Sequence, residues 1–282
     1  MKGCDLRLPK LFKFLPHHFV NIKNHLASAI SIRNFGIRTA IKNRIYKPNK
    51  DALFIFGFAK SGTSAIAGLL AAKSGKSVTI DTHYLWEPYK SKLITGEISL
   101  KEHVEKFSYP FSKNIIKEPN ATFLIKEIKE YFSLNPYIYI VRNPFDNIRS
   151  ILNRLRLPGD QDHVDLNLVN KNWQNLFKET EGKEYIKTLA KKWLEVYSQT
   201  EYLESEACVL TRYEDFNIDK EPFIDKLSER VGFQSQNSIS HLVNRPFQPK
   251  GNSSIDLETF YSPKNYNIIL EICGEKMNSF GY

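Results

Sequence analysis

Short apolar runs alternate with longer amphipathic segments along most of this 282-residue chain. Apolar runs that end at glycine, proline or polar residues are typical of buried strands, and they occur at residues 51–58, 76–80, 121–128, 137–144 and 207–216. Apolar residues at helical spacing occur at residues 64–75, 99–107, 145–156, 183–205, 219–233 and 265–282. Strands that alternate with helices predict a parallel sheet covered on both faces. We therefore expect an α/β fold, a three-layer sandwich in which helices flank the sheet.

Charge divides the chain into two parts. Residues 1–50 contain 11 Lys and Arg and one acid, a net charge of +10, whereas the other residues contain 29 Lys and Arg and 30 acids, a net charge of −1. We therefore predict a basic N-terminal extension over residues 1–50 and a main domain over residues 51–282. The extension either contacts an anionic surface, such as a membrane or a polyanion, or packs as helix on the domain.

The composition is typical of a soluble globular protein, with 41% hydrophobic and 25% charged residues. No apolar run approaches the roughly 20 residues that cross a bilayer, and the start of the chain lacks the continuous apolar core of a signal peptide. The three cysteines are far apart, and the histidines show no metal-ligand spacing. We expect a cytoplasmic protein, at most peripheral to a membrane, with no metal site, and we expect no nucleic-acid partner.

The stretch FIFGFAKSGTSAIAGLL, residues 54–70, places a loop between a predicted strand and a predicted helix. The start of a helix directs unpaired N–H groups and a positive dipole end at such a loop, which favours an anion. In the loop of nucleotide-triphosphate-binding proteins a lysine follows the second glycine. Here Thr63 follows Gly62, and the lysine, Lys60, lies inside the loop. The loop is therefore poorly suited to hold a γ-phosphate beside Mg²⁺. The residues that we expect to bind the anion are Gly57, Lys60, Ser61, Gly62, Thr63 and Ser64.

A second motif, YIYIVRNPFDNIRSIL, covers residues 137–152. Arg142 lies at the carboxyl end of a predicted strand, and open α/β sheets bind their ligands at the carboxyl ends of the strands. Ser150 lies eight residues further along, about two turns into the predicted helix. An arginine and a hydroxyl that converge from these elements can bind a second, separate phosphate.

Together these motifs resemble those of the sulfotransferases that use 3′-phosphoadenosine 5′-phosphosulfate (PAPS). The stretch GFAKSGTS is similar to the family's 5′-phosphosulfate loop, although Ala59 replaces the more common proline or arginine. The family's 3′-phosphate motif, R-x-P-x-D-x-x-x-S, is matched by Arg142, Pro144, Asp146 and Ser150. The segments VLTRYEDFNIDKEPFIDKLSERVGF and CGEKMNSFGY also resemble family segments, so the resemblance covers residues 52–282. It implies a P-loop-like fold and sulfuryl transfer from PAPS to a hydroxyl or amine, without a metal.

The resemblance also implies roles for individual residues. Lys60 would lie beside the oxygen that bridges phosphorus and sulfur, which gains charge as its bond to sulfur breaks. The family's general base is usually a histidine in enzymes for small molecules and a glutamate in enzymes for carbohydrate or tyrosine; the stretch IDTHYLWEPYK contains both His83 and Glu87. We expect Glu87 to be the base, with a helix-capping or ion-paired carboxylate as the alternative, and hence a carbohydrate or glycolipid acceptor. Lys126 resembles a lysine that many members place near the active centre, and a surface lysine is the alternative.

Two further alternatives stay open. Lys250 and Gly251 in NRPFQPKGNSS resemble a family loop that closes over the 3′-phosphate, but the stretch is equally consistent with a proline-rich surface turn. A P-loop kinase or NTPase is the alternative function. Thr63 at the lysine position argues against it, and so does the lack of an evident Mg²⁺-binding aspartate after an apolar strand.

Overall fold

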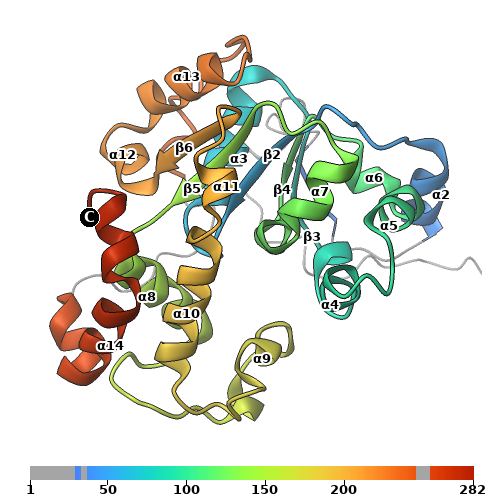
Figure 1. Ribbon diagram of the computed structural model, residues 1–282. Coiled ribbons are helices and arrows are strands. Elements are labelled where there is room, and N and C mark those ends of the chain that lie inside the picture. The colour runs from blue at the N-terminus through green and yellow to red at the C-terminus, as the bar shows by residue number, and fades with distance from the viewer. Residues whose placement is uncertain (1–28, 33–36, 246–254) are drawn as a thin grey trace, which may run out of the picture.

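The computed structural model describes residues 29–32, 37–245 and 255–282 of the chain. Its centre is a six-stranded sheet in the order β1-β3-β4-β2-β5-β6, in which all neighbouring strands are parallel (Figure 1). The strands are β1 (Ala29–Ile32), β2 (Leu53–Gly57), β3 (Val78–Thr82), β4 (Ile115–Lys117), β5 (Tyr137–Val141) and β6 (Cys208–Arg212). The predicted α/β fold with a parallel sheet between helices is confirmed.

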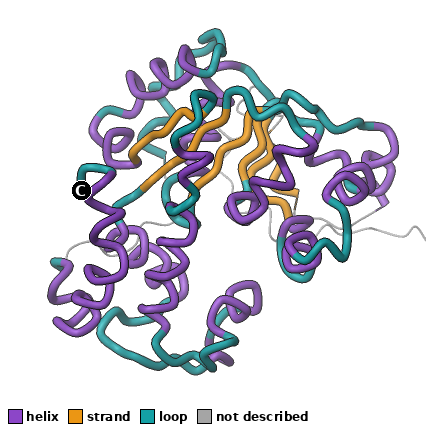
Figure 2. Tube along the Cα trace, viewed as in Figure 1, coloured by secondary structure: helices purple, strands orange, loops and turns teal. Residues whose placement is uncertain are grey.

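Side chains of the central strands alternate between two apolar cores, one on each face of the sheet. Phe54 and Phe56 of β2 belong to the first core, whereas Leu53 and Ile55 belong to the second. Figure 2 shows the strands enclosed by helices. The first core includes α5 (Leu100–Lys106), α7 (Ile125–Tyr131), α8 (Pro144–Leu155), α10 (Tyr185–Tyr197) and α14 (Leu257–Ser279). The second includes α3 (Thr63–Ser74), α12 (Tyr213–Ile218) and α13 (Lys220–Arg230). Both faces are therefore covered, as near-continuous apolar strands require.

Shorter helices connect these elements. They are α2 (Ile37–Ile45), η2 (His83–Leu85), α4 (Tyr89–Ile94), α6 (Ser108–Phe111), η3 (Pro119–Leu124), η4 (Leu166–Leu168), α9 (Lys171–Phe177) and α11 (Thr200–Leu203). Among the described residues, no helix combines the length and the apolar character needed to cross a membrane.

The strand predicted at residues 121–128 is wrong, because this segment forms the end of η3 and most of α7. The strand of this region, β4, lies just before it. Pro119 occupies the first turn of η3, and the Glu118 side chain accepts a hydrogen bond from Asn120 N (3.1 Å). A proline at the first helical positions and a capping carboxylate both favour a helical turn. These two residues, more than the apolar run after them, decide the local structure.

Part of the predicted N-terminal extension packs on the main domain. β1 pairs with β3 in the sheet, and Ser108 and Tyr109 form hydrogen bonds with α2 and with the residue that follows it. Ser108 Oγ donates to the carbonyl oxygens of Asn43 and Tyr46, both at 2.6 Å, and Tyr109 N donates to Asn43 Oδ1 at 3.0 Å. The packed structure therefore begins before residue 50, where the charge changes. Residues 1–28 lie outside the described chain.

Candidate active site

The loop between β2 and α3 has a backbone that only particular residues can adopt. Gly57 has φ +143° and Gly62 has φ +90°, and a Cβ atom at these positions would lie 2.6 Å from Ile140 O and 2.1 Å from the Tyr213 ring, respectively. Lys60 also has a positive φ, 68°. This curved backbone ends at Gly62, where no side chain caps α3. The first N–H groups of α3 thus remain directed at the loop, which is the arrangement that binds anions in other proteins.

Side chains from other elements hold this loop in place. Thr122 Oγ1 accepts from Gly57 N (2.9 Å) and donates to Gly57 O (3.2 Å). Tyr197 OH accepts from Phe58 N (3.2 Å), and Asn147 Nδ2 donates to Ala59 O (2.8 Å). These bonds fix the loop without a ligand, so little ordering entropy has to be lost when an anion binds.

Lys60 carries its charge in an unfavourable environment. The pKa of Lys60 is lowered from 10.5 to about 8, mainly by burial and also by the positive charges of Arg154, Arg142 and Lys117, against a smaller opposite effect of Asp81. Several cations within electrostatic range of one loop repel each other until an anion arrives. The site is therefore complementary to a ligand with more than one negative charge.

Arg142 lies where β5 ends, next to the loop. Its Nη1 donates to Lys60 O (2.8 Å), its guanidinium carbon lies 4.5 Å from the centroid of the Tyr213 ring, and Trp193 Nε1 donates to its carbonyl oxygen (3.0 Å). Arg142 Nε is buried without a hydrogen-bond partner among the described residues. The guanidinium is thus oriented in advance and retains an unused donor.

For the other residues of the predicted second phosphate site, the structure shows no contact with Arg142 among the described residues. Ser150 lies on α8, half-buried, and no contact between it and Arg142 is found in the described part of the chain. Asp146 of the same motif forms an ion pair with Arg149 (2.6 Å). Lys250 and Gly251 lie outside the described residues.

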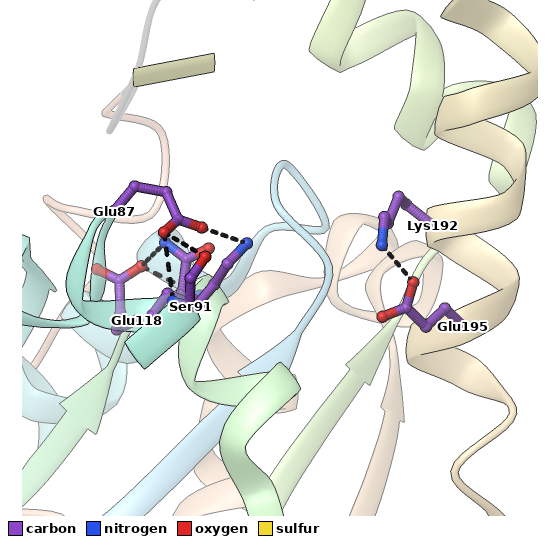
Figure 3. Close-up of polar contacts among 7 residues, drawn as sticks. Glu87, Ser91, Glu118, Lys192 and Glu195 are labelled. Atoms are coloured by element: carbon purple, nitrogen blue, oxygen red, sulfur yellow. Dashed lines mark hydrogen bonds and ion pairs between the residues drawn. The ribbon is translucent and has the colours of Figure 1, made fainter. Parts of the chain in front are cut away.

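The two base candidates both follow β3. His83 begins η2 and its ring lies 4.0 Å from that of Tyr84. Glu87 precedes α4, and its carboxylate accepts from Ser91 Oγ (2.7 Å) and Ser91 N (3.3 Å) and lies 3.4 Å from Lys90 Nζ (Figure 3). Burial raises the pKa of Glu87, but the bonds from Ser91 and the charge of Lys90 outweigh this effect and lower it overall. Glu87 is therefore an ionised carboxylate that also binds the first turn of α4 through Ser91, and its role as the base stays a prediction.

A second carboxylate near Glu87 was not expected from the sequence (Figure 3). Glu118 follows β4 and is fully buried; it accepts hydrogen bonds from Thr82 N (2.8 Å) and Trp86 Nε1 (3.0 Å), besides Asn120. Burial, together with the negative charge of Asp81, raises the pKa of Glu118. Its bonds tie the end of β4 to the segment that carries both base candidates, so Glu118 positions that segment.

Lys117, just before it, is the lysine that β4 brings to the site. Its side chain is 3% exposed and its Nζ lies 2.5 Å from Asp81 Oδ1, and its charge acts on Lys60. Lys126, by contrast, is exposed on α7, and no described contact joins it to the loop. The sequence offered one signal for Lys117, since it ends a short apolar run, but the misplaced strand at residues 121–128 concealed it.

The comparisons with known proteins give structural neighbours only. No family model and no curated protein matches the chain. Among solved structures it is similar to mouse sulfotransferase SULT7A1 complexed with PAP, with 17% identity, a TM-score of 0.47 and coverage of 86% of this chain and 90% of that one. It is also similar to a sulfotransferase from Alicyclobacillus acidocaldarius (14%, 0.44, 81% and 96%) and to the sulfotransferase domain from the curacin biosynthetic pathway (15%, 0.39, 72% and 80%).

Proposed function

We propose that the protein is a sulfotransferase that moves a sulfuryl group from PAPS to a hydroxyl or amine acceptor. The observation that supports this most is the position of Lys60. It lies inside a preformed anion-binding loop, among other cations, while Thr63 occupies the position where a triphosphate-binding loop has its lysine.

The donor has two anionic groups, and the chain offers two places for them. In this proposal the 5′-phosphosulfate binds to the loop and to the first N–H groups of α3, with Ser61, Thr63 and Ser64 as additional donors. Arg142 and Ser150 bind the 3′-phosphate, with Lys250 and Gly251 as further candidates. Lys117, whose charge reaches Lys60, takes the place near the reacting centre that the sequence suggested for Lys126.

The transfer step needs a base, an electrophile and a stabilised leaving group. The acceptor oxygen or nitrogen forms a bond to sulfur, while the bond between sulfur and the bridging oxygen breaks and its electron pair stays on the 5′-phosphate of adenosine 3′,5′-bisphosphate (PAP). Lys60 stabilises that developing charge. The proton of the acceptor passes to Glu87, or to His83 if the histidine is the base.

The acceptor that we propose is a carbohydrate or a glycolipid. Glu87 supports this choice through the resemblance to carbohydrate-type enzymes. The residues around it add hydrogen-bonding groups of the kind that sugars need, since Ser91 and Lys90 lie beside the same carboxylate.

A phosphotransferase that uses ATP and Mg²⁺ is less well supported. The strand neighbours of β2 end in Glu118 and Arg142, and a metal-binding carboxylate would be expected after one of them. Glu118 is already engaged by four N–H donors from three residues. Asp81, after β3, is paired with Lys117. Neither carboxylate is available in the way that a Mg²⁺ ligand must be.

Ligand-induced shifts of the melting temperature separate the two functions. We expect PAP to stabilise the protein more than ATP with Mg²⁺ does, because a ligand that binds only the folded state raises its stability. Arg142→Ala should weaken PAP binding by about 10- to 150-fold, the effect of losing a charge-assisted bond worth about 1.5–3 kcal/mol, whereas Arg230→Ala on α13 should not. Stabilisation by ATP with Mg²⁺ but not by PAP would refute the proposal. Transfer of labelled sulfate from PAPS to a panel of carbohydrate acceptors then tests the reaction itself.

A further inference from the structure

The helix α2 turns its polar side to the protein and apolar residues to the outside, the opposite of what is usual for a surface helix. Its polar side faces the protein, because Asn43 accepts a hydrogen bond from Tyr109 N and Lys42 Nζ donates to Tyr109 OH (3.3 Å). Two of its isoleucines face outward, since Ile41 is 51% and Ile45 is 70% exposed. A surface helix normally turns its apolar stripe to the core. The outward stripe of α2 therefore indicates a second apolar environment outside the protein.

The same face carries positive charge. Arg44 is exposed and adjoins Ile41 by helical spacing, Lys47 is exposed two residues after α2 ends, and residues 37–50 contain five Lys and Arg and no acid. We call Ile41, Arg44, Ile45 and Lys47 the α2 outer face. Apolar residues flanked by bases on one side of a helix are the pattern of helices that lie in a membrane interface.

We propose that the α2 outer face docks the protein on an anionic lipid surface. The isoleucines would enter the boundary between headgroups and acyl chains, while Arg44 and Lys47 would contact the anionic headgroups. Figure 1 shows α2 at one side of the molecule, beyond α5 and α6. This inference goes beyond the proposed reaction and does not depend on it.

Two other partners could cover the α2 outer face, a second copy of the chain and residues 1–28, and charge argues against both. A second copy of the chain in a two-fold contact would bring the same basic face of both copies together, and like charges there oppose association. Residues 1–28 contain five Lys and Arg against one acid, so they carry the same sign as the face that they would cover. Anionic lipid is complementary in both charge and polarity.

Co-sedimentation with vesicles tests the proposal on the full chain. The probes are vesicles of phosphatidylcholine with phosphatidylserine and vesicles of phosphatidylcholine alone. We expect binding to the first, much weaker binding to the second, and loss of binding with added salt. Ile41→Ser combined with Ile45→Ser should reduce partitioning by about tenfold or more, and Arg44→Gln combined with Lys47→Gln by about fivefold for each charge.

Matched controls lie on the opposite side of the molecule (Figure 1). Ile218→Ser removes an isoleucine of α12 that is 83% exposed, and Lys226→Gln removes an exposed charge of α13. Neither should change vesicle binding, and all variants should melt like the wild type because the altered side chains are exposed. Vesicle binding that survives in both α2 variants would overturn the proposal, as would no binding by the wild type. A wild-type dimer that Ile41→Ser and Ile45→Ser convert to monomers would also overturn it, because the second copy would then be the occupant.

Discussion

At the scale of single residues, Lys60 links the electrostatics of the site to a measurable pH dependence. Its folded-state pKa is lowered to about 8, so the free protein holds the charged form below that pH and loses it as the pH rises through it. A bound anion favours the charged form and raises the pKa again. We therefore expect kcat/KM for the donor to fall above about pH 8, because this parameter reports the free enzyme.

Two variants test separately the need for a positive charge at Lys60 and the loss of that charge at high pH. Lys60→Ala should lower turnover by about 10²-fold or more, the effect of removing one transition-state donor, and should weaken PAP binding much less, since PAP lacks the sulfate. Lys60→Arg keeps a charge that does not titrate in this range, so the fall near pH 8 should disappear. An alkaline fall that is unchanged in Lys60→Arg would assign it to another group.

The acid limb of the pH–rate profile, where the rate falls at low pH, distinguishes Glu87 from His83 as the base. Glu87→Gln keeps the shape but cannot accept a proton, so turnover should fall by about 10²- to 10⁴-fold with PAP binding nearly intact. Because the pKa of Glu87 is lowered, the acid limb that it causes should lie below the usual range of a glutamate and vanish in the variant. His83→Gln should leave both unchanged, and Glu97→Gln, which alters an exposed carboxylate nearby in the chain, serves as control. If His83→Gln instead removes an acid limb near neutral pH, the histidine is the base.

At the scale of elements, the donor loop depends on η3. Thr122 is fully buried and its hydroxyl bonds both the N–H and the carbonyl of Gly57. Thr122→Val keeps the shape but leaves Gly57 N without its partner, which costs about 1–3 kcal/mol of stability. The loop should also become less ordered, and PAP should bind more weakly. Denaturant unfolding and calorimetric titration measure the two effects.

The matched control for this variant is another fully buried threonine. Thr79 donates to Pro110 O (2.6 Å), away from the loop. Thr79→Val should lose comparable stability but keep the PAP affinity of the wild type. Equal weakening of PAP binding in both variants would mean that the loss follows from general destabilisation.

The elements also show why the sequence predicted only part of the site. The run before Gly57 and the Ala- and Leu-rich helix after Gly62 predicted β2, the loop and α3, because local pattern decides such units. Thr122, Tyr197 and Asn147 hold that loop from distant parts of the chain, and no local pattern reports such contacts. The apolar run at residues 121–128 suggested a strand, but Glu118 and Pro119 begin a helical turn there. That shift concealed Lys117 and Glu118, which the sheet topology places beside β2 and β3.

At the scale of the whole molecule, the charge pattern and the packing indicate different starting points for the domain. The charge changes at residue 50, whereas β1 and α2 already belong to the packed structure. A chain that begins at Ala29 keeps β1 and α2 and therefore the packing that they provide. A chain that begins at Asp51 loses the strand beside β3 and several hydrogen bonds of residues 42–50, among them those from Ser108 and Tyr109 to Asn43 and Tyr46.

We expect the chain that begins at Asp51 to be less stable by at least about 2–3 kcal/mol, because each lost hydrogen bond contributes about 1 kcal/mol and the apolar contacts of Tyr109 are lost in addition. Its PAP affinity should stay close to that of the full chain, since β2, α3 and Arg142 all lie beyond residue 50. Denaturant unfolding of the two shortened chains, with PAP titration as the test of an intact site, checks both statements. Equal stability of the two would place the boundary at residue 50, where the charge changes, and would make β1 and α2 an appendage of the domain.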